Sequence, residues 1–147
     1  MRGRTCLWGR IFGVLAMFAV SACAGEPTPD PPVLEGKLSS IQELVFTPSC
    51  ATSSCHSSTS KAGNLQLTPE TSYAELVDKF AENGTAKAEG LKRVAPGNAD
   101  ESFLVTKIQK ITKSEYGLAM PTGSPDGVPA DQLKAIKDWI NAGAKND

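Results

Sequence analysis

Two cysteines and the single histidine of this chain lie together in one short stretch. Cys50 and Cys55 are separated by four residues, and His56 follows directly. A cysteine pair followed by histidine is the arrangement that attaches a c-type haem, with the thiols bonded to the vinyl groups and the imidazole bound to iron. The usual spacer has two residues, so this one is longer. The stretch predicts covalent haem attachment, with His56 as an iron ligand.

A second iron ligand has to come from elsewhere in the chain. Once the N-terminal segment described below is removed, the sequence holds no other histidine and one methionine, Met120. Met120 lies in a loop between Gly117 and Gly123, where glycine and proline would stiffen the backbone and aim the thioether inward. A methionine that fills a gap between helices is the alternative. Together with the Cys-Cys-His stretch, the pattern favours Met120 as the second ligand.

Other chemistry fits these residues less well. A structural zinc ion takes four protein ligands, and Met120 is a poor fourth. A thiol–disulfide oxidoreductase has two residues between its cysteines in a βαβ setting. A cysteine protease needs an oriented histidine, whereas the adjacent side chains of Cys55 and His56 diverge. The alternative that stays open is a haem-free helical lipoprotein, a structural or interaction module stapled by a Cys50–Cys55 disulfide.

The N-terminal residues predict export. Three arginines accompany an apolar run over residues 11–20 that is short for a membrane span. The run ends in Val20-Ser21-Ala22-Cys23, which resembles the lipobox of bacterial lipoproteins. That resemblance implies a signal peptide over residues 1–22 and a lipid on Cys23, with an uncleaved membrane anchor as the alternative. Ala24 stands where lipoproteins retained at the inner membrane have aspartate, so we expect the periplasmic face or surface of the outer membrane.

Charge and composition divide the remaining chain. Without the three arginines of the signal peptide, 12 of the 15 basic residues remain against 16 acidic ones, a net charge near −4. No basic patch remains, so nucleic acid is not an expected partner. Residues 23–36 contain four closely spaced prolines and predict an extended linker. Residues 37–147 have the size of one small domain.

The periodic segments of this domain are all helical, and we expect a mostly α fold with long loops. Ser40 and Glu43 have the spacing of a capping box, and Pro69 follows Thr68 as a proline at a first helical position. Helices are expected from Ser40 to Pro48, from Thr68 to Phe80, from Asn98 or Asp100 to Ile111, and from Ala130 to Ala142.

The last of these helices has the clearest pattern. Leu133, Ile136, Trp139 and Ile140 form its apolar stripe, and Gly143 is a natural stop. Even so, four short helices bury little apolar area, and a domain of this size is marginal without further support. A disulfide across so short a loop would constrain little of the unfolded chain. A large apolar cofactor would complete the core.

The order of these features resembles the class I cytochrome c family, in a bacterial branch with the longer cysteine spacer. The resemblance covers most of residues 41–144 and includes the segments Leu91–Gly97 and Ser102–Val105. It implies one covalent haem c surrounded by short helices and long loops. It also implies site residues: Cys50 and Cys55 as thioether donors, His56 as proximal and Met120 as distal ligand, and Lys92 and Arg93 as partners of the haem propionates.

The resemblance further implies a function. A histidine and a methionine together saturate the iron, so the expected role is one-electron transfer by a carrier and not enzymatic turnover. The thioether raises the reduction potential relative to a second nitrogen ligand. The expected partners are redox proteins that present a basic face to this acidic chain, which we expect to be a monomer tethered to a membrane.

Overall fold

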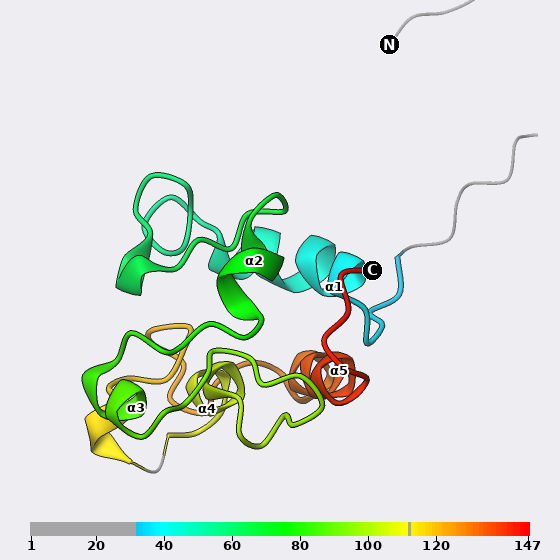
Figure 1. Ribbon diagram of the computed structural model, residues 1–147. Coiled ribbons are helices and arrows are strands. Elements are labelled where there is room, and N and C mark those ends of the chain that lie inside the picture. The colour runs from blue at the N-terminus through cyan, green and yellow to red at the C-terminus, as the bar shows by residue number, and fades with distance from the viewer. Residues whose placement is uncertain (1–31, 112) are drawn as a thin grey trace, which may run out of the picture. The chain divides into compact units, whose positions relative to one another are not determined.

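The computed structural model describes residues 32–111 and 113–147, which belong to one compact unit, Pro31–Asp147 (Figure 1). Within these residues the regular structure is helical and contains no strands, only isolated β-bridges. The expectation of an all-α domain is therefore confirmed. None of the described helices has the length and apolar character to cross a membrane. The expected signal peptide, Cys23 and most of the linker lie outside the described residues.

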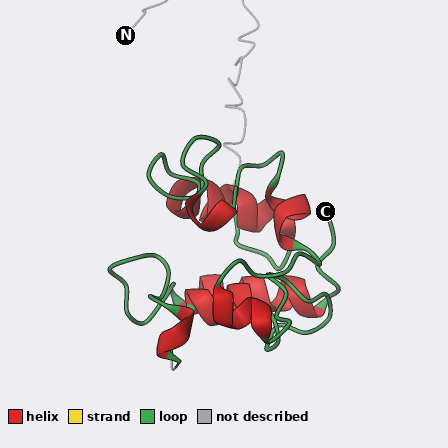
Figure 2. Cartoon of the chain, turned by 60° about the vertical axis from the view of Figure 1, so that its left-hand side comes forward, coloured by secondary structure: helices red, strands yellow, loops and turns green. Residues whose placement is uncertain are grey.

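Short helices alternate with long loops along the chain (Figure 2). The elements are α1 (Leu38–Ile41), η1 (Gln42–Cys50), η2 (Ala62–Asn64), α2 (Ser72–Leu76), α3 (Gly84–Ala88), α4 (Phe103–Ile108), η3 (Ser114–Tyr116) and α5 (Ala130–Asn141). Of these, η1 is a π-helix, and η2 and η3 are 3₁₀ turns.

The expected last helix is confirmed as α5. Ile136, Trp139 and Ile140 are almost fully buried, and the indole N–H of Trp139 donates to the carbonyl of Lys145 at 2.8 Å. Gly143 follows with φ +101°, a conformation that ends the helix at little cost for glycine. The apolar spacing of this segment was therefore sufficient to predict both its extent and its buried face.

The first helix differs from expectation at both ends. It begins at Leu38, so Ser40 is not its cap; the Ser40 hydroxyl instead accepts from the backbone N–H of Glu35 at 2.9 Å. Pro48 does not end the helix but lies inside η1, which continues to Cys50. A proline removes one N–H and clashes with the carbonyl four residues earlier. The wider π-helical register, with bonds to the fifth residue back, accommodates it.

Helix α2 is shorter than expected. It starts at Ser72, one turn after Thr68, and ends at Leu76, so the expectation that Phe80 lies on this helix was wrong. The backbone N–H of Asp78 donates to the carbonyl of Val94 at 3.1 Å. Pairing with the segment that contains Val94 therefore replaces the helical bonds beyond Leu76, and Phe80 becomes exposed.

Two further differences involve the middle of the chain. Helix α4 begins at Phe103 and not at Asn98 or Asp100, because the Asn98 side chain closes a local turn by accepting from the N–H of Glu101. Helix α3 was not expected. Asn83 caps it by accepting from the N–H of Ala86 at 3.0 Å.

The core brings the two ends of the domain together. Helices α1 and α5 are in contact, and α5 also contacts α4 (Figure 1). A Cβ atom on Gly36 would lie 2.9 Å from the Cβ of Asp138, so glycine permits the chain to approach α5 closely just before α1. Buried residues of η1, α2, α4 and α5 join the same core cluster. Several residues of this core also line the candidate functional site.

Candidate functional site

A cavity of about 360 Å³ lies against this core. The volume is within the range of about 300–1,000 Å³ that is usual for sites of small ligands and cofactors. Its walls come from η1, α2, α4, α5 and the loops between them, and they are mainly aliphatic and aromatic. The lining residues are Val45, Phe46, Cys50, His56, Ala62, Gly63, Leu65, Leu67, Leu76, Ala81, Glu82, Asn83, Arg93, Phe103, Leu104, Lys107, Ile108, Tyr116, Met120, Val128 and Ile136.

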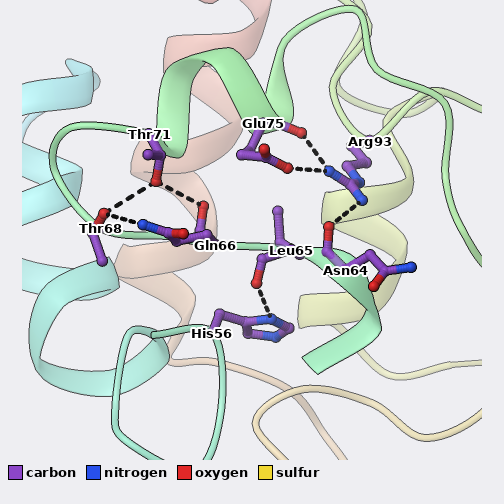
Figure 3. Close-up of polar contacts among 8 residues, drawn as sticks. All are labelled: His56, Asn64, Leu65, Gln66, Thr68, Thr71, Glu75 and Arg93. Atoms are coloured by element: carbon purple, nitrogen blue, oxygen red, sulfur yellow. Dashed lines mark hydrogen bonds and ion pairs between the residues drawn. The ribbon is translucent and has the colours of Figure 1, made fainter. Parts of the chain in front are cut away.

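His56 lines this cavity with one ring nitrogen already committed. Its Nδ1 lies 3.2 Å from the backbone carbonyl of Leu65, and because a carbonyl only accepts, Nδ1 carries the proton (Figure 3). The Nε2 atom is then the nitrogen with a free lone pair. The backbone of His56 is held as well, through its N–H to the carbonyl of Cys50 and its carbonyl to the N–H of Leu67. A hydrogen bond from Nδ1 to a carbonyl is compatible with metal binding through Nε2.

The two cysteines have different environments. Cys50 lines the cavity, and burial raises the pKa of its thiol to about 11. Cys55 is not among the lining residues, and hydrogen bonds from Thr52 and Ser54 lower the pKa of its thiol. Both thiols are free in the described chain, without a disulfide between them. The structure therefore brings Cys50 together with His56 at the cavity and leaves Cys55 beside it.

Met120 lines the same cavity although it is distant from His56 in sequence. Its backbone N–H donates to the carbonyl of Lys107 at 2.6 Å. The Nζ of Lys107 donates to the carbonyl of Tyr116 at 3.0 Å and to that of Leu118. At the end of the loop that precedes α5, the backbone N–H of Val128 donates to the carbonyl of Ile108, the last residue of α4. Helix α4 thus holds residues 117–129, the methionine loop, against the cavity.

The two predicted propionate partners are placed differently. Arg93 is buried, lines the cavity, and forms an ion pair with Glu75 at 2.9 Å. Lys92 does not line the cavity; its Nζ pairs with Asp78 at 2.8 Å on the outside of the domain. Of the two, only Arg93 is placed beside the other candidate residues.

Sequence reasoning missed several polar residues of the cavity wall. Lys107 is the clearest case, and burial lowers the pKa of its ammonium group. A lysine on the apolar face of a helix, four residues after Phe103, was the available signal. Glu82, Asn83 and Tyr116 also line the cavity, and they lie in segments without a periodic pattern that would have placed them there.

The chemistry available here is specific. The described residues include no group of three or more His, Cys, Asp or Glu side chains arranged to hold a metal ion. What the cavity does collect is an imidazole, a thioether and a thiol within an apolar enclosure. Comparison of the chain with protein-family models, with curated proteins and with solved structures gave no match.

Proposed function

We propose that this protein is a monohaem c-type electron carrier with a class I cytochrome c-like fold. The observation that carries the proposal is that His56, Met120 and Cys50 line one apolar cavity. The first two are the predicted iron ligands, and nothing in their sequence separation brings them together. The third is a predicted attachment point for the haem, with Cys55 as the second.

The residues that line the cavity fit a haem. Histidine ligands of metals usually donate the other ring N–H to a carbonyl or carboxylate, and the contact between His56 and Leu65 provides this. The aliphatic and aromatic walls suit a porphyrin face. Arg93 donates from three of its five N–H groups to Glu75 and Asn64, and the other two, which have no partner among the described residues, are available to a propionate at the cavity.

Bound haem would supply an iron that accepts and returns one electron. His56 and Met120 would hold this iron from the protein side and would leave no position for a substrate, so the role would be electron transfer and not turnover. The apolar cavity wall disfavours the additional charge of the oxidised form and therefore acts with the thioether to raise the reduction potential. We further propose an exported lipoprotein, tethered through Cys23, whose partners are redox proteins.

The test is an optical spectrum of the full chain, exported from cells that have a c-type haem maturation system, followed by a haem stain on a denaturing gel. We expect a low-spin spectrum and a stain that stays with the chain. A spectrum without retained stain would overturn covalent attachment. A colourless protein would overturn the proposal and favour the haem-free lipoprotein stapled by a Cys50–Cys55 disulfide.

A further inference from the structure

Three consecutive backbone carbonyls begin at the last residue of η2, and each accepts a hydrogen bond from a different side chain. The carbonyl of Asn64 accepts from Arg93 at 2.8 Å, and that of Leu65 accepts from His56 at 3.2 Å. The third, of Gln66, accepts from the hydroxyl of Thr71 at 3.4 Å. Figure 3 shows these contacts side by side. The segment that orients His56 is therefore itself held on both sides.

Arg93 is the stronger of the two holding residues. Its Nη1 donates to both the carbonyl and the carboxylate of Glu75, at 2.8 and 2.9 Å, while Nη2 reaches Asn64. Only 9% of Arg93 is exposed. A buried guanidinium is tolerated when its charge is paired and its donors are used, and a planar fork with several bonds has a fixed direction. Arg93 therefore joins the end of α2 rigidly to the Asn64 carbonyl.

The link from Arg93 to His56 is one peptide unit long. Asn64 has φ +54°, a left-handed conformation that is uncommon for non-glycine residues and that asparagine tolerates best. The Asn64 carbonyl and the N–H of Leu65 lie in one peptide plane. Fixing the direction of this carbonyl therefore limits the rotation of Leu65, whose own carbonyl accepts the hydrogen bond from Nδ1 of His56. Among the residues that the structure describes, Arg93 is the one side chain that donates to the Asn64 carbonyl.

We propose that Arg93 is a positioning residue for His56. It acts through the Asn64–Leu65 segment to keep Nδ1 protonated and hydrogen-bonded, so that Nε2 is presented as the ligand atom. The inference rests on the proposed function in assigning iron to Nε2. It extends the expected role of Arg93, whose two remaining donors have no partner in the described part of the chain and so stay available to a propionate.

The test follows the His56 Nδ1 proton by isotope-edited NMR in the reduced, diamagnetic full-length protein. We expect Arg93→Lys, which keeps the charge but loses the fork, to speed solvent exchange of this proton about tenfold, the effect of losing one hydrogen bond to a charged group. Glu75→Gln removes the partner charge and should give a smaller increase. Lys92→Gln, a neighbouring cation outside the cavity, should leave the exchange rate unchanged.

Ile140→Val distinguishes positioning from general loss of stability, because it lowers the melting temperature from the core of α5. Its exchange rate should stay at the wild-type value. Wild-type rates in both Arg93→Lys and Glu75→Gln would overturn the inference, as would equal acceleration in Ile140→Val. If Arg93→Lys does not fold, Glu75→Gln decides. If the wild-type chain carries no haem, the proposed function fails, and the Nδ1 proton of the haem-free chain still tests the Arg93 contact.

Discussion

The backbone N–H of Met120 donates to the carbonyl of Lys107 at 2.6 Å, and the Lys107 side chain donates back to the same loop. One residue of α4 thus holds the predicted distal ligand from two directions. The side-chain bonds reach the carbonyls of Tyr116 and Leu118, just before the methionine. The position of the thioether therefore depends on a helix that is not adjacent to it in sequence.

Removing the Lys107 donors should release this loop. Lys107→Met keeps the length of the side chain but loses both hydrogen bonds, and we expect it to lower the free energy of unfolding by about 1–2 kcal/mol, since the ammonium group is only partly buried. In the haem protein the absorption band of the ferric thioether–iron bond should weaken. Lys110→Met, at an exposed position just after α4, is the control. Equal behaviour of the two variants would contradict the holding role.

The two ligands should have distinct phenotypes. His56→Ala should abolish the low-spin spectrum, because the proximal ligand and its orienting contact with Leu65 are both lost. Met120→Ala should open one coordination position while the haem stays attached to the chain, so that added imidazole restores a low-spin spectrum. Unchanged spectra in both variants would show that the ligands were assigned wrongly.

The thiols of the haem-free chain should react at different rates. Burial raises the pKa of Cys50 to about 11, whereas hydrogen bonds lower the pKa of Cys55. The thiolate is the reactive form, so a small alkylating reagent should label Cys55 first at mildly alkaline pH. Peptide mapping by mass spectrometry measures the order. In the haem-loaded protein neither cysteine should be labelled, and a labelled Cys55 would show that only one thioether bond had formed.

The haem-free chain should lose stability as the pH rises from 9.0 to about 11, because the buried thiol of Cys50 has a raised pKa in the folded chain. Burial raises the pKa of the Cys50 thiol from 9.0 to about 11, so the folded chain keeps this proton up to about pH 11. Unfolding therefore releases a proton between these values, and the free energy of unfolding falls as pH rises, by about 2–3 kcal/mol in total. Urea titrations of Cys50→Ser measure the difference. If the free energy of unfolding of Cys50→Ser falls with pH as steeply as that of the wild-type chain, burial of the thiol is contradicted.

Gly127 should not tolerate a side chain. It has φ +87°, and a Cβ atom would overlap the carbonyl oxygen of Ile108, where the methionine loop returns to α4. We expect Gly127→Ala to lower the free energy of unfolding by about 2–4 kcal/mol, from backbone strain and overlap together. Gly123→Ala is a matched control, since Gly123 has φ +94° and no atom within 4 Å of its Cβ position. A thermal melt that places both variants at the same midpoint would refute the steric reading.

Local patterns predicted the parts of the fold in which bonds close within a few residues. Helix α5 is the best example: its apolar stripe and Gly143 both have the expected roles. The helical class of the domain followed from the same periodicity. Where a distant segment competes for the backbone, the pattern failed, as at Asp78, whose N–H bonds to Val94 and ends α2 before Phe80. Propensity cannot indicate such a bond, because its partner is remote in the chain.

The same distinction between local and long-range features applies to the residues of the candidate site. Residue types and adjacency alone singled out Cys50, Cys55 and His56. These residues lie within seven consecutive positions, so no tertiary structure is needed to bring them together. Met120 was singled out as the remaining methionine, but only the packing of α4 against its loop brings it to the cavity of His56. The burial of Arg93 and its bond to Asn64 were likewise decided by tertiary structure. The physical reason is that side-chain direction and burial depend on contacts between distant segments, which residue identity does not specify.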